Sequence, residues 1–261
     1  MPSIEVELSS AGVARVTMNR PEVFNAFDES VIEELDRAFR RLSADPQVRV
    51  AVLAGAGRHF SAGADLHWMQ RASSATPEWN LEDARRFAAM LAGIANCPKP
   101  TVARIQGAAL GGGVGLACAC DVAICGAEAT FCVSEAKFGI LPAVIGPHLA
   151  GAIGRRQARR LALTAARIDA TEALRIGLAH QVVAATELDA AVDATVAETL
   201  RCAPGAQAEI KRLFARFGAA EITDDVLELT ARTISRVRAT DEAREGFCAF
   251  FDKRDPGWIR K

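Results

Sequence analysis

The sequence lacks the glycine patterns that mark several large enzyme classes. No G-x-G-x-x-G follows the first predicted strand, and neither Gly-Lys-Ser/Thr nor G-x-S-x-G occurs. These patterns build dinucleotide sites, phosphate-binding loops and serine nucleophile elbows, respectively. Their absence argues against nucleotide hydrolysis and against a serine-hydrolase mechanism.

An excess of charge of either sign is also missing. The 261 residues include 31 Lys and Arg and 32 Asp and Glu, which gives a net charge of −1. A general nucleic-acid binder would carry a large basic excess, so the balance argues against nucleic acid as a partner. One local basic cluster is present, and it consists of Arg155, Arg156, Arg159 and Arg160. It could be an RNA-binding patch or a solvated helix face.

Long apolar runs are absent too. No run approaches the length of a membrane-spanning helix, and residues 1–8 contain no hydrophobic segment of a signal peptide. Four of the seven cysteines fall between residues 118 and 132 with no histidine among them, so the spacing of a zinc site is missing. We expect reduced core thiols, no metal site and a soluble, cytoplasmic protein. The seven are Cys97, Cys118, Cys120, Cys125, Cys132, Cys202 and Cys248.

Half of the residues are hydrophobic, which is enough for a large core. Apolar patterning predicts a first hairpin and then strands that alternate with helices. The predicted strands are 4–8, 13–18, 48–54, 101–105 and 121–125. Helices are expected after an N-cap at Asp28, around Phe87, Leu91 and Ile94, and at 116–120. Alternation over 48–125 predicts parallel, buried strands with crossovers, while Ser73, Ser74, Thr76 and Pro77 predict a mobile surface segment at 71–80.

The second half of the chain is predicted to be helical. Helices are expected at 147–164, 171–176, 187–202, 204–216, 223–239 and 241–252. We divide the chain into a core, 1–195, and a C-terminal helical region, 196–261. The second region needs a surface to pack on, which another subunit could provide.

Two small-residue segments lie where a predicted strand gives way to a helix. They are Phe60-Ser61-Ala62-Gly63-Ala64-Asp65-Leu66 and Gly111-Gly112-Gly113-Val114-Gly115. Small residues expose backbone N–H groups and let a ligand approach closely. Two such segments could direct two N–H groups at one oxygen, as in an oxyanion hole for thioester chemistry. The alternative is a tight contact between helix and strand.

Glu135 lies in the largely apolar stretch 131–136. A carboxylate there must be paired, in contact with water, or functional. Burial would raise its pKa toward the range that suits general acid–base catalysis. A paired, structural glutamate remains the alternative.

Together these segments resemble the crotonase family, the enoyl-CoA hydratases and isomerases. The resemblance covers essentially the whole chain, from Asn19-Arg20-Pro21 through Pro98-Lys99-Pro100, Cys120-Asp121 and Gly177-Leu178 to Phe250-Phe251-Asp252-Lys253-Arg254. It implies an α/β fold with a ββα superhelical, acyl-CoA-binding core and a C-terminal trimerisation region. It also implies a homotrimer or a dimer of trimers, with no cofactor because coenzyme A is part of the substrate.

The resemblance also implies roles for individual residues. The amides of Ala64 and Gly112 would form the oxyanion hole, and Glu135 would be the acid or base. Further positions would contact CoA: Ala62, Asp65 and Leu66 at the adenine, Phe24 and Ala26 beside the CoA moiety, Arg58 near the phosphates, and Lys253 reaching a neighbouring subunit's CoA. Arg58 and Lys253 could instead be ordinary surface charges, and Asp65 could only cap the following helix.

One position departs from the family pattern. Typical enoyl-CoA hydratases hold water with two glutamates, and the position of the first is Gly115 here. Water could be held by Glu135 and the main chain, another residue could replace the carboxylate, or the reaction could be a proton shift, as in Δ3,Δ2-enoyl-CoA isomerases.

Segments 65–69, 111–116 and 134–147 resemble a bacterial subgroup that includes methylglutaconyl-CoA hydratases. Such substrates carry a second carboxylate, which needs a cationic partner. The candidates are Lys137, His67 and His148. We therefore predict hydration of 3-methylglutaconyl-CoA or a related branched enoyl-CoA. The alternative is an isomerase, followed by an acyl-CoA hydrolase and a non-catalytic CoA- or RNA-binding protein.

Overall fold

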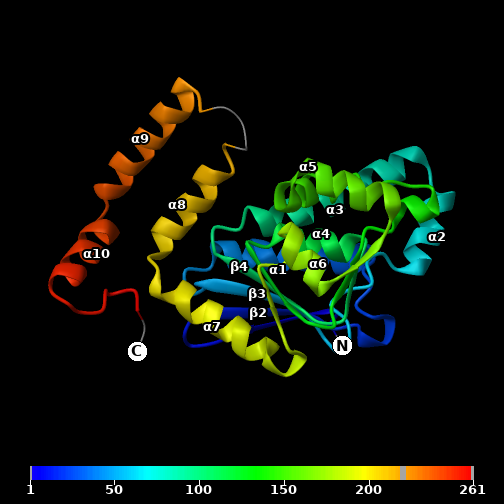
Figure 1. The fold of residues 1–261 in the computed structure, drawn as a ribbon, viewed down its shortest axis with the longest axis horizontal. Helices are drawn as coiled ribbons and strands as arrows, with labels where there is room; N and C mark the ends of the chain where they lie inside the picture. Colours follow the sequence, from blue (N-terminus) through cyan, green and yellow to red (C-terminus); the bar gives the residue numbers. More distant parts are fainter. Residues whose placement is uncertain (1, 218–221, 260–261) are drawn as a thin grey trace.

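Two β-sheets organise the chain, whose residues 2–217 and 222–259 are described by a computed structural model (Figure 1). The larger sheet has the strand order β1-β2-β3-β4-β6-β9. Its strands are Ile4–Leu8, Val13–Met18, Val50–Gly55, Thr101–Ile105, Val122–Gly126 and Gln181–Val183. β1 and β2 are antiparallel and the other neighbours are parallel. The predicted hairpin and the predicted parallel strands are confirmed.

The smaller sheet has the order β5-β7-β8. Its strands are Ala108–Leu110, Thr130–Cys132 and Arg167–Asp169. The sequence analysis missed these strands and β9, because three residues are too few to show a hydrophobic period. β5 matters most for function, since it leads directly into α4 (Gly112–Ala119). The predicted helix at 116–120 begins four residues earlier than expected, at glycines that have low intrinsic helix propensity.

Helices cover both faces of the larger sheet. The core on one face includes α1 (Glu29–Ala44), α3 (Pro77–Ala95) and α4, while α7 (Leu188–Arg201) packs on the other. Val50 and Val52 of β3 face α7, whereas Leu53 faces the main core. Burial on both faces explains the continuous apolar run at this strand.

Residues 71–80 lie at the surface, as expected, but the expectation of an irregular, mobile segment is wrong because they are helical. These residues belong to α2 (Leu66–Ser74) and α3, which are separated by only two residues. Thr76 caps α3 by accepting a hydrogen bond from Trp79 N at 3.2 Å, and Pro77 occupies the first turn. The Ser73 hydroxyl donates to the Gln70 carbonyl at 2.8 Å. The polar residues that resembled a loop therefore end one helix and begin the next.

The remaining helices follow the predicted pattern. They are α5 (Gly146–Thr164), α6 (Ala170–Ile176), α8 (Pro204–Phe214), α9 (Asp224–Arg238) and α10 (Asp241–Phe251), with short 3-10 turns at Pro21–Val23, Glu135–Phe138 and Ala185–Glu187. Residue 1 of the predicted core, and residues 218–221 and 260–261 of the predicted C-terminal region, lie outside the described residues. Within the described residues, every helix is too short or too polar to span a membrane.

The C-terminal helices extend away from the core (Figure 1). Helices α8 and α9 contain no buried residue, and α10 buries only Ala249. Large apolar side chains are exposed along them: Ile210, Phe214, Leu227, Ile234, Phe247, Phe250 and Phe251. We call α8, α9 and α10 the C-terminal arm.

All seven cysteines are free thiols. Cys97, Cys120, Cys125 and Cys132 are buried and Cys118 is half-buried, as expected for core thiols. The expectation of a core position is wrong for Cys202, which follows α7, and for Cys248 within α10, because both are exposed.

Candidate active site

The loop before α2 leaves the amide of Ala64 without a protein acceptor. Ala64 forms an isolated parallel bridge with Phe27. Phe27 N donates to Gly63 O at 2.8 Å, and Asp65 N donates to Phe27 O at 3.0 Å. In such a bridge the N–H of the central residue points to the opposite side. Ala64 N accordingly donates no hydrogen bond to any residue that the structure describes.

A second free amide begins α4. Gly111 N donates to Cys132 O at 2.8 Å, which continues the small sheet, and the next amide, Gly112 N, is the first of the helix. The first N–H groups of a helix have no partner within it. Gly112 N also finds no acceptor elsewhere within residues 2–217 and 222–259.

The two amides are brought together by contact between backbones. Leu110 N donates to Ser61 O at 2.9 Å, which pairs the loop with β5. A Cβ on Gly63 would lie 2.5 Å from Leu110 O and 3.4 Å from Gly112 N. Gly63 also has a φ of +84°, which disfavours a side chain. The loop therefore reaches Gly112 only because residue 63 is glycine.

Both amides line one cavity of about 540 Å3. Three aromatic rings pack around Gly112, with centroid separations of 5.3 Å for Phe27–Phe87, 6.1 Å for Phe27–Trp68 and 6.3 Å for Trp68–Phe87. The remaining lining is mostly apolar and comes from α2, α3 and the segment before α5: Met69, Ala72, Ser73, Asn80, Asp83, Ala84, Glu135, Phe138, Ile140, Leu141, Pro142, Ala143, Val144 and Ile145.

Glu135 places its carboxylate over the turn that precedes the second amide. Its Oε1 lies 3.4 Å from the position that a Cβ on Gly111 would occupy. Its Oε2 is buried and has no hydrogen-bond partner among the described residues. Burial raises the pKa of Glu135, while backbone hydrogen bonds from Glu135 and Ser134 oppose the rise. A buried carboxylate with an unpartnered oxygen suits proton transfer better than a structural ion pair.

Hydrocarbon fills the position where the family's first glutamate would stand. A Cβ on Gly115 would lie 2.3 Å from Ile145 Cγ2 and 3.6 Å from Leu91 Cδ1. A longer side chain at residue 115 would have to displace Ile145. The missing carboxylate is therefore part of the packing of α4, and a pair of glutamates at 115 and 135 does not fit this cavity.

The positions expected to hold CoA lie mainly at the surface beside this cavity. Phe24 and Leu66 are exposed, by 50% and 77%. Ala62 N donates to Phe24 O at 2.9 Å, which ties their two loops together, and Phe24 packs edge-on against His59 at 5.0 Å. Ala26 is buried, 7% exposed. These contacts join the two loops at one side of the molecule.

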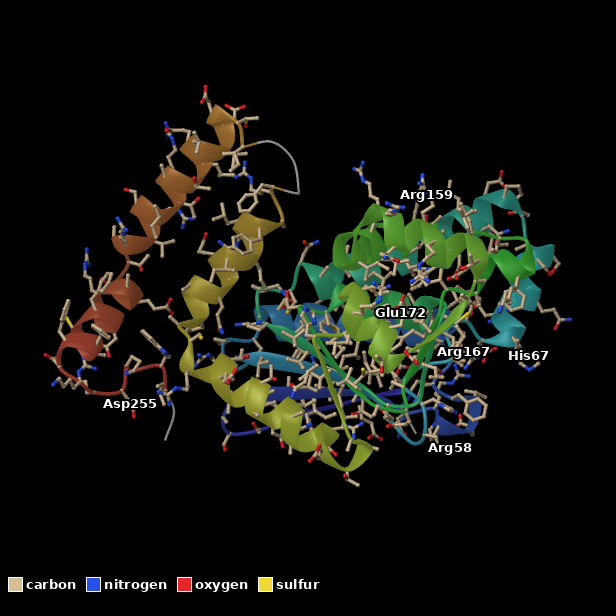
Figure 2. All side chains as sticks on the ribbon, viewed as in Figure 1. Arg58, His67, Arg159, Arg167, Glu172 and Asp255 are labelled. Carbon is tan, nitrogen blue, oxygen red and sulfur yellow. The ribbon has the colours of Figure 1, made fainter. Side chains whose placement is uncertain are left out.

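The three charged positions expected to contact CoA, Arg58, Lys253 and Asp65, lie in different places. Arg58 is exposed at the same end of the molecule as His67, whereas Asp255, two residues after Lys253, lies at the opposite end (Figure 2). The structure therefore does not bring Lys253 to the cavity of its own chain. Asp65 caps α2, as the alternative interpretation stated, because Oδ1 accepts from His67 N at 2.8 Å.

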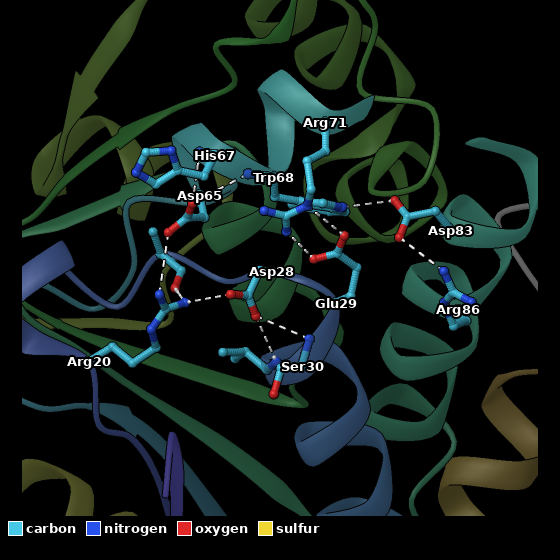
Figure 3. A network of polar contacts seen from close by, with 12 residues as sticks. Arg20, Asp28, Glu29, Ser30, Asp65, His67, Trp68, Arg71, Asp83 and Arg86 are labelled. Atoms are coloured by element: carbon cyan, nitrogen blue, oxygen red, sulfur yellow. Dashed lines mark hydrogen bonds and ion pairs between the residues drawn. The ribbon is translucent and has the colours of Figure 1, made fainter. Parts of the chain in front are cut away.

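A polar network that the sequence analysis missed surrounds this cap (Figure 3). Arg20 lies 3.4 Å from both Asp28 and Asp65, so it joins the N-terminal caps of α1 and α2. On the far side of α2, Trp68 Nε1 donates to Asp83 Oδ2 at 3.1 Å. Asp83 lies one helical turn before Phe87, so the spacing of four residues could have placed both on one face.

None of the cations proposed to hold a second substrate carboxylate lines the cavity. Lys137 and His67 are exposed outside its lining, and His148 lines a different depression beside Cys118. Burial lowers the pKa of His148, which disfavours its cationic form. The arginine cluster is also remote: Figure 2 shows Arg159 projecting outward from α5, and Arg160 pairs with Glu172 at 2.6 Å. That pairing favours the solvated-face interpretation.

Comparisons with known proteins agree with this fold and cavity. The family model for enoyl-CoA hydratase/isomerase matches residues 9–261. A carnitinyl-CoA dehydratase of Proteus mirabilis is 34% identical over 265 residues, which cover 98% of each chain. An enoyl-CoA hydratase structure from Shewanella pealeana has a TM-score of 0.95 at 38% identity, covering 98% of this chain and 96% of that one. Pseudomonas aeruginosa AtuE has a TM-score of 0.94 at 40% identity, covering 99% and 100%.

These similarities define a crotonase-fold enzyme of the lyase type. The chain belongs to the enoyl-CoA hydratase/isomerase family.

We predict that Gly115→Ala lowers the free energy of unfolding by about 1–3 kcal/mol, because the new Cβ overpacks against Ile145. In an Ile145→Ala background the same change should cost less, since Cγ2 is gone and only the Cβ of residue 145, 2.9 Å away, still meets the new methyl group. Urea denaturation measures both. Gly151→Ala on α5, where the Cβ meets open space, is the matched control and should not destabilise. Equal losses in both backgrounds would contradict the contact.

The raised pKa of Glu135 predicts a pH-dependent stability difference. The folded state holds its proton more tightly than the unfolded state, so wild-type stability falls as pH rises from 4.5 through the folded-state pKa. Glu135→Gln should therefore melt at a higher temperature than wild type at neutral pH, and the difference should vanish below pH 4.5. Thermal unfolding across this range measures it. A difference independent of pH would show that ionisation of Glu135 is not its cause.

Proposed function

We propose that this protein adds water across the double bond of a branched, α,β-unsaturated acyl-CoA. One observation carries the proposal: Ala64 and Gly112, whose amides have no acceptor among the described residues, line the same cavity as Glu135, whose Oε2 is buried without a partner. The amides suit an oxygen that gains negative charge, and the carboxylate suits a proton that moves beside it. The names of two relatives, an enoyl-CoA hydratase and a carnitinyl-CoA dehydratase, support an acyl-CoA substrate.

The chemistry needs only one acid–base group. Glu135 takes a proton from water as the water oxygen bonds to C3 of the acyl chain. Electrons of the double bond move to the thioester oxygen, where the N–H groups of Ala64 and Gly112 stabilise the enolate. The carboxylic acid of Glu135 then returns the proton to C2, and the sum is the addition of one water molecule. A single oxyanion donor of this kind commonly stabilises the transition state by about 3–4 kcal/mol.

The lining supports the expectation that the acyl group is branched, but not that it carries a second carboxylate. Ile145, Val144 and the three aromatic rings offer apolar surface to a branched chain. The finer expectation, 3-methylglutaconyl-CoA, also needs a cation for the second carboxylate. The three candidates from the sequence lie outside the lining, so we favour a related branched enoyl-CoA.

We expect Glu135→Gln to lower kcat/KM for hydration by about 10²–10⁴-fold, the usual contribution of a positioned acid–base group. The measurement is turnover of a panel of enoyl-CoAs with product identification. Glu82→Gln is the control, because it removes an equal charge from an exposed position on α3 and should leave the rate unchanged. Unchanged hydration by Glu135→Gln would remove this residue from the mechanism.

An isomerase is the second candidate, favoured by the hydrocarbon at Gly115. A double-bond shift moves a proton between two carbons and needs no held water, so one carboxylate suffices. Oxygen-18 water separates the two reactions: hydration places the label in a 3-hydroxyacyl product, and isomerisation leaves the product unlabelled.

We further propose that the C-terminal arm assembles a cytoplasmic homotrimer or a dimer of trimers, and that CoA binds across the loops of Phe24 and Ala62. The exposed apolar side chains of the arm support assembly, because large contiguous apolar surfaces in monomers are rare. In the trimer Arg58 would approach the phosphates, and Lys253 would approach a neighbour's CoA.

We predict that Phe250→Asp reduces the molar mass measured by multi-angle light scattering to that of a monomer or of a smaller assembly. Phe250 is 78% exposed on α10, so a charge there should not disturb the core of its own chain. Leu163→Asp on α5, at a site 75% exposed outside the arm, is the matched control and should retain the mass. An unchanged mass for Phe250→Asp would place assembly elsewhere.

A further inference from the structure

The cavity contains a second carboxylate that the mechanism does not use. Asp83 lies on the face of α3 that also presents Asn80, Ala84 and Phe87 to the cavity. It is only 6% exposed. Burying a carboxylate in an apolar wall costs free energy, so the position of Asp83 points to a functional role.

The carboxylate is held in place on both oxygens (Figure 3). Oδ2 accepts from Trp68 Nε1 at 3.1 Å, and Oδ1 lies 3.4 Å from Arg86 Nη2. Burial raises the pKa of Asp83 and the nearby Glu29 adds to the rise, whereas Arg86 and Trp68 lower it. Arg86 is itself exposed and does not line the cavity.

The other charged residue that lines the cavity has the same sign as Asp83. Among the described residues that line it, Glu135 and Asp83 are the charged ones, and no lysine or arginine joins them. A second carboxylate on the acyl chain would meet two like charges and no cation. A neutral chain would meet the apolar surface of the aromatic rings.

We propose that Asp83 is a specificity residue that selects acyl groups without a second carboxylate. The inference rests on the proposed function for the location of the acyl chain and deepens it by naming the class of substrate: neutral, branched enoyl thioesters. Asp83 acts through the field of its fixed carboxylate. Its hydrogen bonds to Trp68 and Arg86 fix the carboxylate in the wall, and the kinetics below separate this role from that of a proton-transfer partner in place of a glutamate at residue 115.

A matched pair of thioesters tests selection. 3-Methylcrotonyl-CoA and 3-methylglutaconyl-CoA differ by one carboxylate, and wild type should favour the neutral member in kcat/KM. Asp83→Asn keeps an acceptor for Trp68, removes the charge and frees Arg86. It should shift the preference toward the carboxylate by roughly tenfold, the effect of one charged contact in a partly screened site. Glu82→Gln, the adjacent exposed charge, should leave the ratio unchanged.

Kinetics on the neutral thioester separate specificity from catalysis. Asp83→Asn should retain its rate within about threefold, whereas a proton-transfer role would cost about 10²–10⁴-fold. Such a loss would overturn the proposal. So would a wild-type preference for 3-methylglutaconyl-CoA, or an unchanged ratio in Asp83→Asn.

Binding of saturated analogues keeps this test independent of turnover. The Kd ratio of isovaleryl-CoA to 3-methylglutaryl-CoA should change in Asp83→Asn in the same direction, and an unchanged ratio would overturn the proposal. If wild type turns over no enoyl-CoA and the binding ratio still shifts, the proposed reaction fails and the role of Asp83 stands. Tryptophan fluorescence of Asp83→Asn checks that Trp68 keeps its place.

Discussion

The close approach of two backbone segments is the constraint on which this site depends. The loop that ends at Ala64 touches the junction of β5 and α4, and a Cβ on Gly63 would overlap Leu110 O. The same closeness leaves no room for a side chain at Gly112, where a Cβ would lie 2.3 Å from Phe27 Cζ. Small residues are needed here for contact as well as for conformation. The tight contact that the sequence left open is present, and the same contact places Ala64 and Gly112 side by side, as the proposed oxyanion hole requires.

The site is chemically asymmetric as a result. Ala64 and Gly112 lie on one side of the cavity, the carboxylate of Glu135 lies beside them, and Ile145 fills the space next to Gly115. Apolar surroundings disfavour the ionised form of Glu135, so it is a stronger base than an exposed glutamate. A dry wall also strengthens the interaction between the amides and a developing negative charge. Hydrocarbon in place of a carboxylate beside Gly115 therefore makes the surroundings of Glu135 and the two amides less polar.

Much of the fold and part of the site followed from local patterns. β1, β2 and β4 have clear periods or apolar runs, and the two glycine segments indicated either free amides or a tight contact between helix and strand, a choice that the sequence left open. The three-residue strands of the small sheet were missed because their pairing is set by distant parts of the chain. Asp83 was missed because a charge on a helix usually faces solvent. Its burial depends on Trp68, fifteen residues earlier, which no local pattern reveals.

The polar network around α2 links parts of the site that are described separately above. Ala64, which offers one amide, is followed directly by Asp65, which fixes the first turn of α2 and is itself fixed by Arg20. Trp68 lies on the same turn and lines the cavity. Helix α2 therefore connects the cavity wall at Trp68 to the amide of Ala64. One helical turn therefore fixes both the indole in the cavity wall and the residue that follows Ala64, so the shape of the cavity and the placement of the Ala64 amide depend on the same few contacts.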